Sequence, residues 1–339
     1  DGMKQWVDVM QKNIVDGIYE AKEMQFCDWC ALDGPKNLLN SNNVIGGTNE
    51  EYVCTVYYYY SLTLTSKAAK VLGKDDDYNK YNKLAQEALQ NIRNKYFSDN
   101  GKCAVQTQTG VSLAIVHDLQ PEGSIQTSLE ILCKLLKDRN YHLCTGFIGT
   151  QILCKALTKA GANDVAITTF LQQDYPGWLY PVTMGATTMW ERWGALKPDG
   201  KVAPEGMNSF NHYAYGSICE WIYCDVCGLN PVEESPGFKK VILRPNPSSR
   251  LGNAMLSYDS PMGRYECKWV VENNKVTYTF SIPFNAYAKL ILLKLKKNDV
   301  ISSSFETREE EDDVVADLNH GDYEIVYNYK EENTLDKLN

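Results

Sequence analysis

The residues best suited to chemistry lie between Gly185 and Trp193, where a single carboxylate stands between two indoles. Glu191 is the carboxylate, and Trp190 and Trp193 are the indoles. Flat indole faces pack on the C–H faces of sugar rings, and a carboxylate among them can activate a water molecule or act on a glycosidic bond. The alternative is that both tryptophans are core residues three apart on one helix, with Glu191 solvated.

Two further aromatic stretches flank this segment and favour the carbohydrate interpretation. Residues 175–180 contain Trp178, which is either a stacking surface or a core residue. Residues 209–216 contain His212, placed at the start of an expected helix. No carboxylate–histidine spacing typical of a metal site accompanies His212, so we interpret it as a side chain that binds a sugar hydroxyl group.

An upstream segment adds a second carboxylate and another indole. Asp28 is followed directly by Trp29 in a stretch that reads as a loop. We expect Asp28 to accept hydrogen bonds from sugar hydroxyl groups, and the alternative is that it caps its own loop. Trp29 is a candidate stacking platform, although an indole there is equally compatible with a core position.

The order of these motifs resembles the α-L-rhamnosidases of glycoside hydrolase family 78 over most of residues 1–290. The matching segments are Cys27–Ala31, Thr145–Gly149, Pro176–Trp178, Gly185–Trp193, Asn211–Tyr213 with Gly216, and Gly237–Lys239. The resemblance implies an (α/α)6 toroid followed by a C-terminal β-sandwich, and metal-free inverting hydrolysis of terminal α-L-rhamnosides. It further implies that Glu191 is the general base, with Asp28, Trp29 and His212 near the sugar.

The sequence departs from that family in one respect. The resemblance places the general acid in an Asp-, Arg- and Glu-rich motif upstream of the Asp28–Trp29 segment, and no such motif occurs here. We therefore expect either a fragment of a longer glycoside hydrolase or a non-catalytic carbohydrate-binding remnant that lacks the acid. The expected partner in both cases is a rhamnose-containing glycan or glycoside.

Other functions have less support. A different toroid enzyme, such as a uronide hydrolase or lyase, is disfavoured because the net charge is −9 and few basic residues lie near the candidate site. The same charge argues against nucleic acid as a partner. The sequence contains no apolar run of about 18 residues, so we expect no membrane span. Neither a glycine-rich phosphate loop nor Gly-x-Ser-x-Gly occurs, which disfavours nucleotide chemistry and the α/β-hydrolases.

The eleven cysteines bear on cofactors and compartment. Most lie in apolar helical patterns, as free buried thiols do, and this weakly favours a reducing, cytoplasmic location. Two Cys-x-x-Cys pairs, Cys27/Cys30 and Cys224/Cys227, each resemble half of a zinc site. They are too far apart in sequence for a compact zinc ribbon and no histidine pair accompanies them, so we expect no metal and no other cofactor.

Residues 1–232 predict about eight helices with short connections, which favours stacked helical hairpins. A six-hairpin ring needs twelve, so we expect an incomplete toroid whose open edge, along the first helix, promotes self-association. The expected helices are 3–18 (apolar stripe Met3 to Ile18), 49–72, 78–96, 106–117, 124–138, 148–160, 164–172 and 210–227.

Residues 233–339 predict a small antiparallel β-sandwich after a linker rich in proline and glycine. Alternating apolar residues at 265–271 and 276–282 flank Asn273–Asn274, which predicts a hairpin. Further strands are expected at 288–295 and 323–327. The acidic run Glu306–Asp313 is interpreted as a solvated loop, and calcium is the alternative, although the Asp-x-Asp-x-Asp-Gly pattern is absent.

Overall fold

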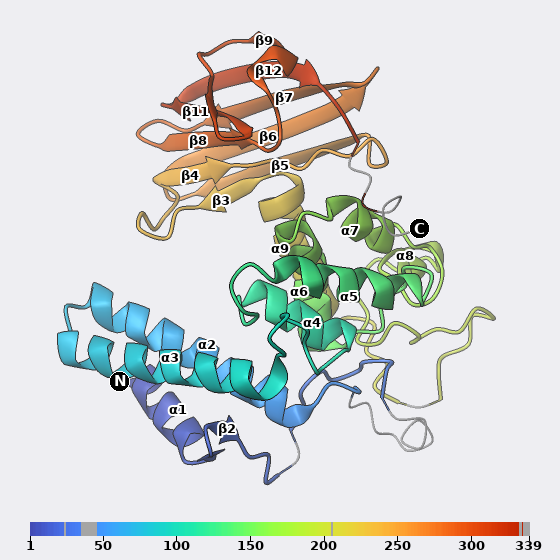
Figure 1. Ribbon diagram of the computed structural model, residues 1–339. Helices are drawn as coiled ribbons and strands as arrows, with labels where there is room; N and C mark the ends of the chain where they lie inside the picture. Colours follow the sequence, from blue (N-terminus) through green and yellow to red (C-terminus); the bar gives the residue numbers. More distant parts are fainter. Residues whose placement is uncertain (24, 35–45, 205, 332–333, 335–339) are drawn as a thin grey trace. The chain divides into compact units, whose positions relative to one another are not determined.

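The helical half of the chain and the β-rich half form separate units in the computed structural model, which describes residues 1–23, 25–34, 46–204, 206–331 and 334 (Figure 1). The units are Asp1–Gly216 and Ser217–Lys337. The helices of the first unit are α1 (Gly2–Gln11), α2 (Glu50–Val71), α3 (Asp75–Tyr96), α4 (Gln108–Val116), α5 (Ile125–Lys137), α6 (Phe147–Lys159), α7 (Asn163–Phe170) and α8 (Leu179–Thr183).

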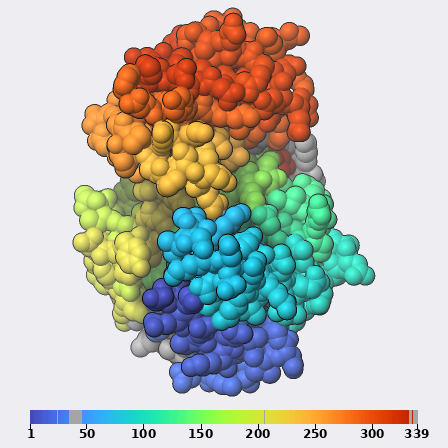
Figure 2. All heavy atoms as spheres, turned by 90° about the vertical axis from the view of Figure 1, so that its left-hand side faces the viewer, coloured from blue at the N-terminus to red at the C-terminus, as the bar shows by residue number. Residues whose placement is uncertain are grey.

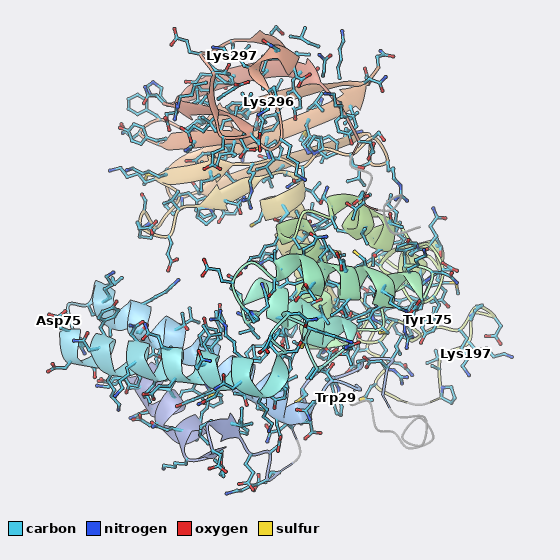
Figure 3. All side chains as sticks on the ribbon, viewed as in Figure 1. Trp29, Asp75, Tyr175, Lys197, Lys296 and Lys297 are labelled. Atoms are coloured by element: carbon cyan, nitrogen blue, oxygen red, sulfur yellow. The ribbon has the colours of Figure 1, made fainter. Side chains whose placement is uncertain are left out.

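The longest hairpin, α2–α3, forms where the sequence predicts two helices. Asn49 caps α2, since its side-chain oxygen accepts a hydrogen bond of 2.8 Å from the N–H of Tyr52. Gly73, with φ of 65°, follows the helix and makes the left-handed turn that glycine allows without strain. The two helices lie side by side in Figure 1, and Asp75 marks the tip of the hairpin in Figure 3.

The shorter helices pack in sequence around α4. Every residue of α4 from Gln108 to Ile115 is buried, because α4 packs against both α5 and α6. The next helix, α7, packs in turn on α6. This succession of packed neighbours is the stacked-hairpin arrangement that the sequence predicts.

The expected first helix, 3–18, is wrong in its second half. Helix α1 ends at Gln11, and Ile14 and Ile18 lie instead in a small hairpin of β1 (Ile14–Val15) and β2 (Ile18–Tyr19). Its two-residue turn is Asp16–Gly17, with φ of 48° and 79°. An Asp–Gly pair favours this turn. The apolar residues keep their 3–4 spacing beyond Gln11, although the backbone there changes from a helix to a hairpin.

The expected helix 210–227 begins later than predicted and is not uniform. It starts as a 3-10 turn at Ala214–Ser217, continues as α9 (Ile218–Trp221) and ends as a π-helical turn at Ile222–Val226. His212 therefore lies in the loop before it. The N–H of His212 donates to the carbonyl of Met189 in the loop around residue 190, in place of the intrahelical bond that a helix beginning at residue 210 would give it.

Two five-stranded sheets pack face to face in the second unit (Figure 1). In the sheet ordered β5-β6-β7-β12-β9, the hairpin β6–β7 pairs Trp269 with Tyr278 across the turn Asn273–Asn274, as the alternation predicts. The other sheet, ordered β10-β11-β8-β4-β3, contains one parallel pair, β4 with β8, so the sandwich is not entirely antiparallel. The strands are β3 (Leu229–Pro231), β4 (Lys240–Leu243), β5 (Asn253–Ser260), β6 (Gly263–Glu272), β7 (Lys275–Ile282), β8 (Tyr287–Leu292), β9 (Val300–Ser303), β10 (Arg308–Glu310), β11 (Asp313–Leu318) and β12 (Gly321–Asn328).

The acidic run Glu306–Asp313 is a β-hairpin rather than a loop. It contains β10 and the start of β11, which pair antiparallel. Two of its six carboxylates have basic partners: Glu310 contacts Lys289 at 2.8 Å and Arg308 at 2.7 Å, and Asp312 contacts Lys296 at 2.7 Å. These ion pairs offset part of the negative charge of the hairpin.

Candidate active site

The segment that carries Glu191 is an irregular loop, and backbone bonds tie it to the segment before His212. The N–H of Glu191 donates to the carbonyl of Ser209 at 2.9 Å. The N–H of Ser209 donates to Oε2 of Glu191 at 3.1 Å. The N–H of His212 donates to the carbonyl of Met189 at 2.9 Å. These bonds bring the carboxylate and the imidazole, 21 positions apart in sequence, to one place.

The three tryptophans around Glu191 are buried. Trp178, Trp190 and Trp193 are only 2–3% exposed. Trp193 stacks on Tyr215, with ring centroids 3.9 Å apart and planes 6° from parallel. Its indole N–H donates to the carbonyl of Thr145, and that of Trp178 donates to the carbonyl of Tyr215. These rings are core residues in an irregular segment, and their faces are not open to a sugar.

Asp28 is also buried, and the protein satisfies its carboxylate. It is 1% exposed and accepts hydrogen bonds from the N–H groups of Gly146, Ile148 and Gly149 at 2.9–3.0 Å. The hydroxyl of Thr109 donates to it as well. Burial raises the pKa of Asp28, and these hydrogen bonds oppose the rise. Asp28 thus caps the start of α6 and not its own loop, so its bonds differ from the local cap that was the alternative expected for it.

Trp29 remains partly accessible and sits at the start of α6. Its carbonyl accepts a hydrogen bond of 2.9 Å from the N–H of Phe147. A Cβ at position 146 would lie 2.1 Å from the same carbonyl oxygen, so only glycine permits this approach. Trp29 lies in the helical unit, away from the Asp75 tip of the α2–α3 hairpin (Figure 3).

Phe147 joins this loop to His212. Its ring stacks on His212, with centroids 5.1 Å apart and planes 30° from parallel. It also meets Tyr215 edge to face at 5.5 Å. The half-buried His212 ring is therefore held against Phe147, the first residue of α6, whose backbone N–H bonds to the Trp29 carbonyl. His212 is thus linked to Glu191 through the backbone bonds of the two loops and to the Trp29 backbone through Phe147.

Electrostatic contacts link the two loops. Burial raises the pKa of Cys30 to about 12, with Arg192 opposing the rise and Glu191 and Asp28 adding to it. Arg192 also donates to the carbonyl of Gly206 at 3.0 Å, which anchors the Glu191 loop.

Four residues that support this site were not predicted. Thr109 donates a hydrogen bond to Asp28, and Ser209 donates one to Glu191. Phe147 stacks on His212, and Tyr215 stacks on Trp193. Phe147 lies within a motif of the family resemblance, so sequence contained a signal for it. Ser209 and Tyr215 lie within the aromatic stretch 209–216, whereas Thr109 acts through a long-range contact that no local pattern predicts.

Among the described residues, no group of three or more His, Cys, Asp or Glu side chains is arranged to hold a metal ion. In the same part of the chain, no helix has the length and apolarity needed to cross a membrane. None of the eleven cysteines, all of which lie among the described residues, is in a disulfide.

Family models match both halves of the chain. The six-hairpin glycosidase domain of bacterial α-L-rhamnosidases matches residues 1–226, and the C-terminal domain of the same enzymes matches residues 228–305. An α-L-rhamnosidase from Alteromonas sp. is 32% identical over 85% of this chain, and one from Streptomyces avermitilis is 34% identical over 73%. The chain spans 31% and 24% of their lengths.

Solved structures agree with these matches. The Streptomyces avermitilis α-L-rhamnosidase, solved with L-rhamnose, is similar over 96% of this chain with a TM-score of 0.83 and 28% identity. The Aspergillus terreus enzyme gives the same three values. The chain covers 30% and 36% of these two structures. The chain thus belongs to the six-hairpin glycosidase family of the bacterial α-L-rhamnosidases and represents part of the length of such an enzyme.

Proposed function

We propose that this chain contributes the general base and part of the sugar-binding surface to the inverting hydrolysis of terminal α-L-rhamnosides. Glu191 is the proposed base. The observation that supports it is the double backbone link to Ser209, which fixes the carboxylate through Oε2. Within the described residues Oε1 accepts no hydrogen bond, so it is available to take a proton from water.

Trp29 and His212 are the proposed contacts to the sugar. Both are half-buried, so each has a face or edge open to a ligand while the rest is held by protein. An indole packs on the apolar face of a pyranose, and an imidazole nitrogen binds a hydroxyl group. We propose that Asp28 does not contact the sugar itself, and that its carboxylate positions the Trp29 loop.

Inverting hydrolysis also needs a proton donor, with the two carboxyl groups roughly 6.5–9.5 Å apart. We assign no donor within this chain, which covers about a third of its relatives' length. Carbohydrate binding without catalysis is therefore the second candidate function. The two candidates differ in their action on a rhamnoside with a good leaving group, which departs with little protonation. A chain that contributes the general base hydrolyses such a rhamnoside, whereas a chain that only binds sugar does not.

The test uses an activated aryl α-L-rhamnoside, a natural rhamnosyl disaccharide and free L-rhamnose. The proposal expects saturable binding of L-rhamnose, slow hydrolysis of the aryl rhamnoside to β-L-rhamnose by NMR, and much slower hydrolysis of the disaccharide. Binding without any hydrolysis supports the binding-only alternative. Retention of the α configuration contradicts an inverting base, and absence of rhamnose binding contradicts both candidates.

We also propose that the outer face of α1 mediates self-association. Met3, Trp6 and Val9 are 44–59% exposed on this helix, whereas Val7 and Met10 are buried beneath it. The N-terminal residues reach the surface in Figure 2. Exposed apolar residues at this spacing favour burial against a second copy. Light scattering at micromolar concentration should show a dimer or larger species that Trp6→Lys reduces, and a monomeric wild type contradicts the proposal.

A further inference from the structure

A groove of about 440 Å³ crosses the first four strands of the sheet β5-β6-β7-β12-β9 in the second unit. Two rows of side chains, aligned by the pairing of the strands, form its walls. One row consists of Met255, Lys268, Thr279 and Glu324. The other row consists of Ser257, Glu266, Ser281 and Asp322. The four strands lie side by side in Figure 1, so both rows run across them.

The alternation of side chains along each strand explains why the two rows leave a groove between them. Successive residues of a strand point to opposite faces of the sheet. The row between the two walls therefore points inward, and its residues Leu256, Cys267 and Phe280 are buried. The walls are about 7 Å apart and the four strands span about 14 Å, given the spacings within a sheet. An elongated ligand that lies across the strands fits these dimensions.

Three charged side chains in the groove are available to a ligand. Within the part of the chain that the structure describes, the exposed side chains of Glu266, Lys268 and Glu324 make no hydrogen bond or ion pair. By contrast, Asp322 accepts a hydrogen bond of 2.6 Å from the hydroxyl of Ser281, so the protein itself fixes that corner of the groove. The volume of the groove lies within the range of roughly 300–1,000 Å³ that small-ligand sites have.

The charges and hydroxyl groups of the walls favour a neutral ligand that is rich in hydroxyl groups. Three carboxylates against one ammonium group disfavour an anion, and Lys268, in the middle of its row, disfavours a cation. An apolar ligand would remove water from charged groups without replacing their hydrogen bonds. A sugar hydroxyl both donates and accepts, so it satisfies a carboxylate and an ammonium group alike. Met255, 73% exposed at one end of its row, offers an apolar contact to the C–H face of a sugar ring.

We propose that this groove binds a neutral oligosaccharide, which lies across the four strands. Hydroxyl groups of the sugar donate to Glu266 and Glu324 and accept from Lys268, and the side chain of Met255 packs against a ring. Every residue involved lies in the second unit, so the inference does not depend on the function proposed for the helical unit. The second unit then holds a glycan by itself, in addition to the sugar bound by the helical unit.

The site is tested by NMR on the full chain, labelled with ¹³C in the methyl groups of its eight methionines. The Met255 signal, assigned by its loss in Met255→Leu, reports on the groove. Met262, in the same unit but outside the groove, is the internal reference. Titration with a neutral α-L-rhamnosyl-glucose disaccharide should shift the Met255 signal saturably and leave the Met262 signal in place. No shift of Met255, or tighter binding of the cation spermidine than of the disaccharide, overturns the proposal.

The matched variants for the groove are Glu266→Gln and Glu272→Gln. Both replace an exposed carboxylate on the same face of β6, and only the first of the two lies in the groove. In Glu266→Gln, a weaker neutral hydrogen bond replaces a charge-assisted one. The disaccharide should therefore bind several-fold more weakly to Glu266→Gln, and as tightly to Glu272→Gln as to the wild type. Equal affinities of the two variants refute the role of the groove.

A further methionine separates this inference from the proposed function. The carbonyl of Met189 accepts the N–H of His212, so the Met189 methyl signal reports on the candidate active site. Trp29→Ala should weaken the response of Met189 to the disaccharide and leave that of Met255 unchanged. Loss of both responses in Trp29→Ala contradicts a separate site in the groove. If Met189 does not respond in the wild type, the proposed function fails, while Met255 still decides whether the groove binds a sugar.

Discussion

Glu191 and Ser209 exchange two hydrogen bonds, one between backbone atoms and one from the Ser209 N–H to the Glu191 carboxylate. The pair joins two loops that are separated by 17 residues in sequence (residues 192–208). A carboxylate held by a backbone N–H keeps its position without a second side chain. This relationship places Glu191 beside the segment that leads to His212, and the proposed chemistry depends on it.

Replacing Asp28 with asparagine, a side chain of nearly the same shape, should destabilise the helical unit. In Asp28→Asn, the amide NH2 must face N–H donors at the start of α6, so buried groups lose their partners. We expect a loss of about 2–4 kcal/mol in the free energy of unfolding. Urea unfolding measures it, with Asp118→Asn, an exposed carboxylate, as the control. A loss no larger than that of the control contradicts the anchoring role.

The tryptophans should separate into two classes. Trp193→Ala removes a ring that is 2% exposed and stacked on Tyr215, and should cost about 3–5 kcal/mol of stability. Trp29→Ala should cost clearly less but weaken L-rhamnose binding at least several-fold. Urea unfolding and isothermal titration on the same samples make the comparison. The division is contradicted if neither variant loses affinity for L-rhamnose, or if the two variants lose the same amount of stability.

Some features of the fold and site follow directly from the sequence. The apolar alternation on either side of Asn273–Asn274 predicts the β6–β7 hairpin, and the structure confirms it. Asp16–Gly17 is as clear a turn signal, but the apolar spacing from Met3 to Ile18 continues through it and favours a longer helix than forms. Periodicity records which residues are apolar and does not record where the backbone changes conformation.

The burial of the site residues could not be predicted in the same way. An indole suits either a sugar or a core, and the choice for Trp178 and Trp193 depends on Tyr215, which reaches them only in the folded chain. The four donors to Asp28 come from residues more than 80 positions away. Local sequence contains the residue types of the site, whereas long-range packing decides which of them face a ligand.

His117 should make stability depend on pH below neutrality. It packs beside Tyr57 and Tyr60, and burial, aided by Lys159 and Lys155, lowers its pKa from 6.5 to about 4, with Asp118 opposing. Between these values the unfolded chain binds the proton and the folded chain does not, so stability is lost as the pH falls from 6.5 to 4.

We expect that loss, on the order of 1–3 kcal/mol from this one group, to be absent in His117→Phe. Urea unfolding at several pH values from 7.5 to 4 measures the difference between the two proteins. The difference in their free energies of unfolding should change in favour of the variant as the pH falls. A difference that is constant over this range contradicts the effect of burial on His117.

The most direct test of the account is Glu191→Gln, assayed for hydrolysis of an activated aryl α-L-rhamnoside and for L-rhamnose binding. The amide keeps the shape of the side chain and can still accept the Ser209 hydrogen bond, but it cannot take a proton from water. Asp199→Asn, on the same stretch of chain and exposed, is the control. The account predicts loss of hydrolysis by about 100-fold or more with rhamnose affinity nearly unchanged, because general-base catalysis contributes that much. Hydrolysis by Glu191→Gln within a few-fold of the wild type would contradict it.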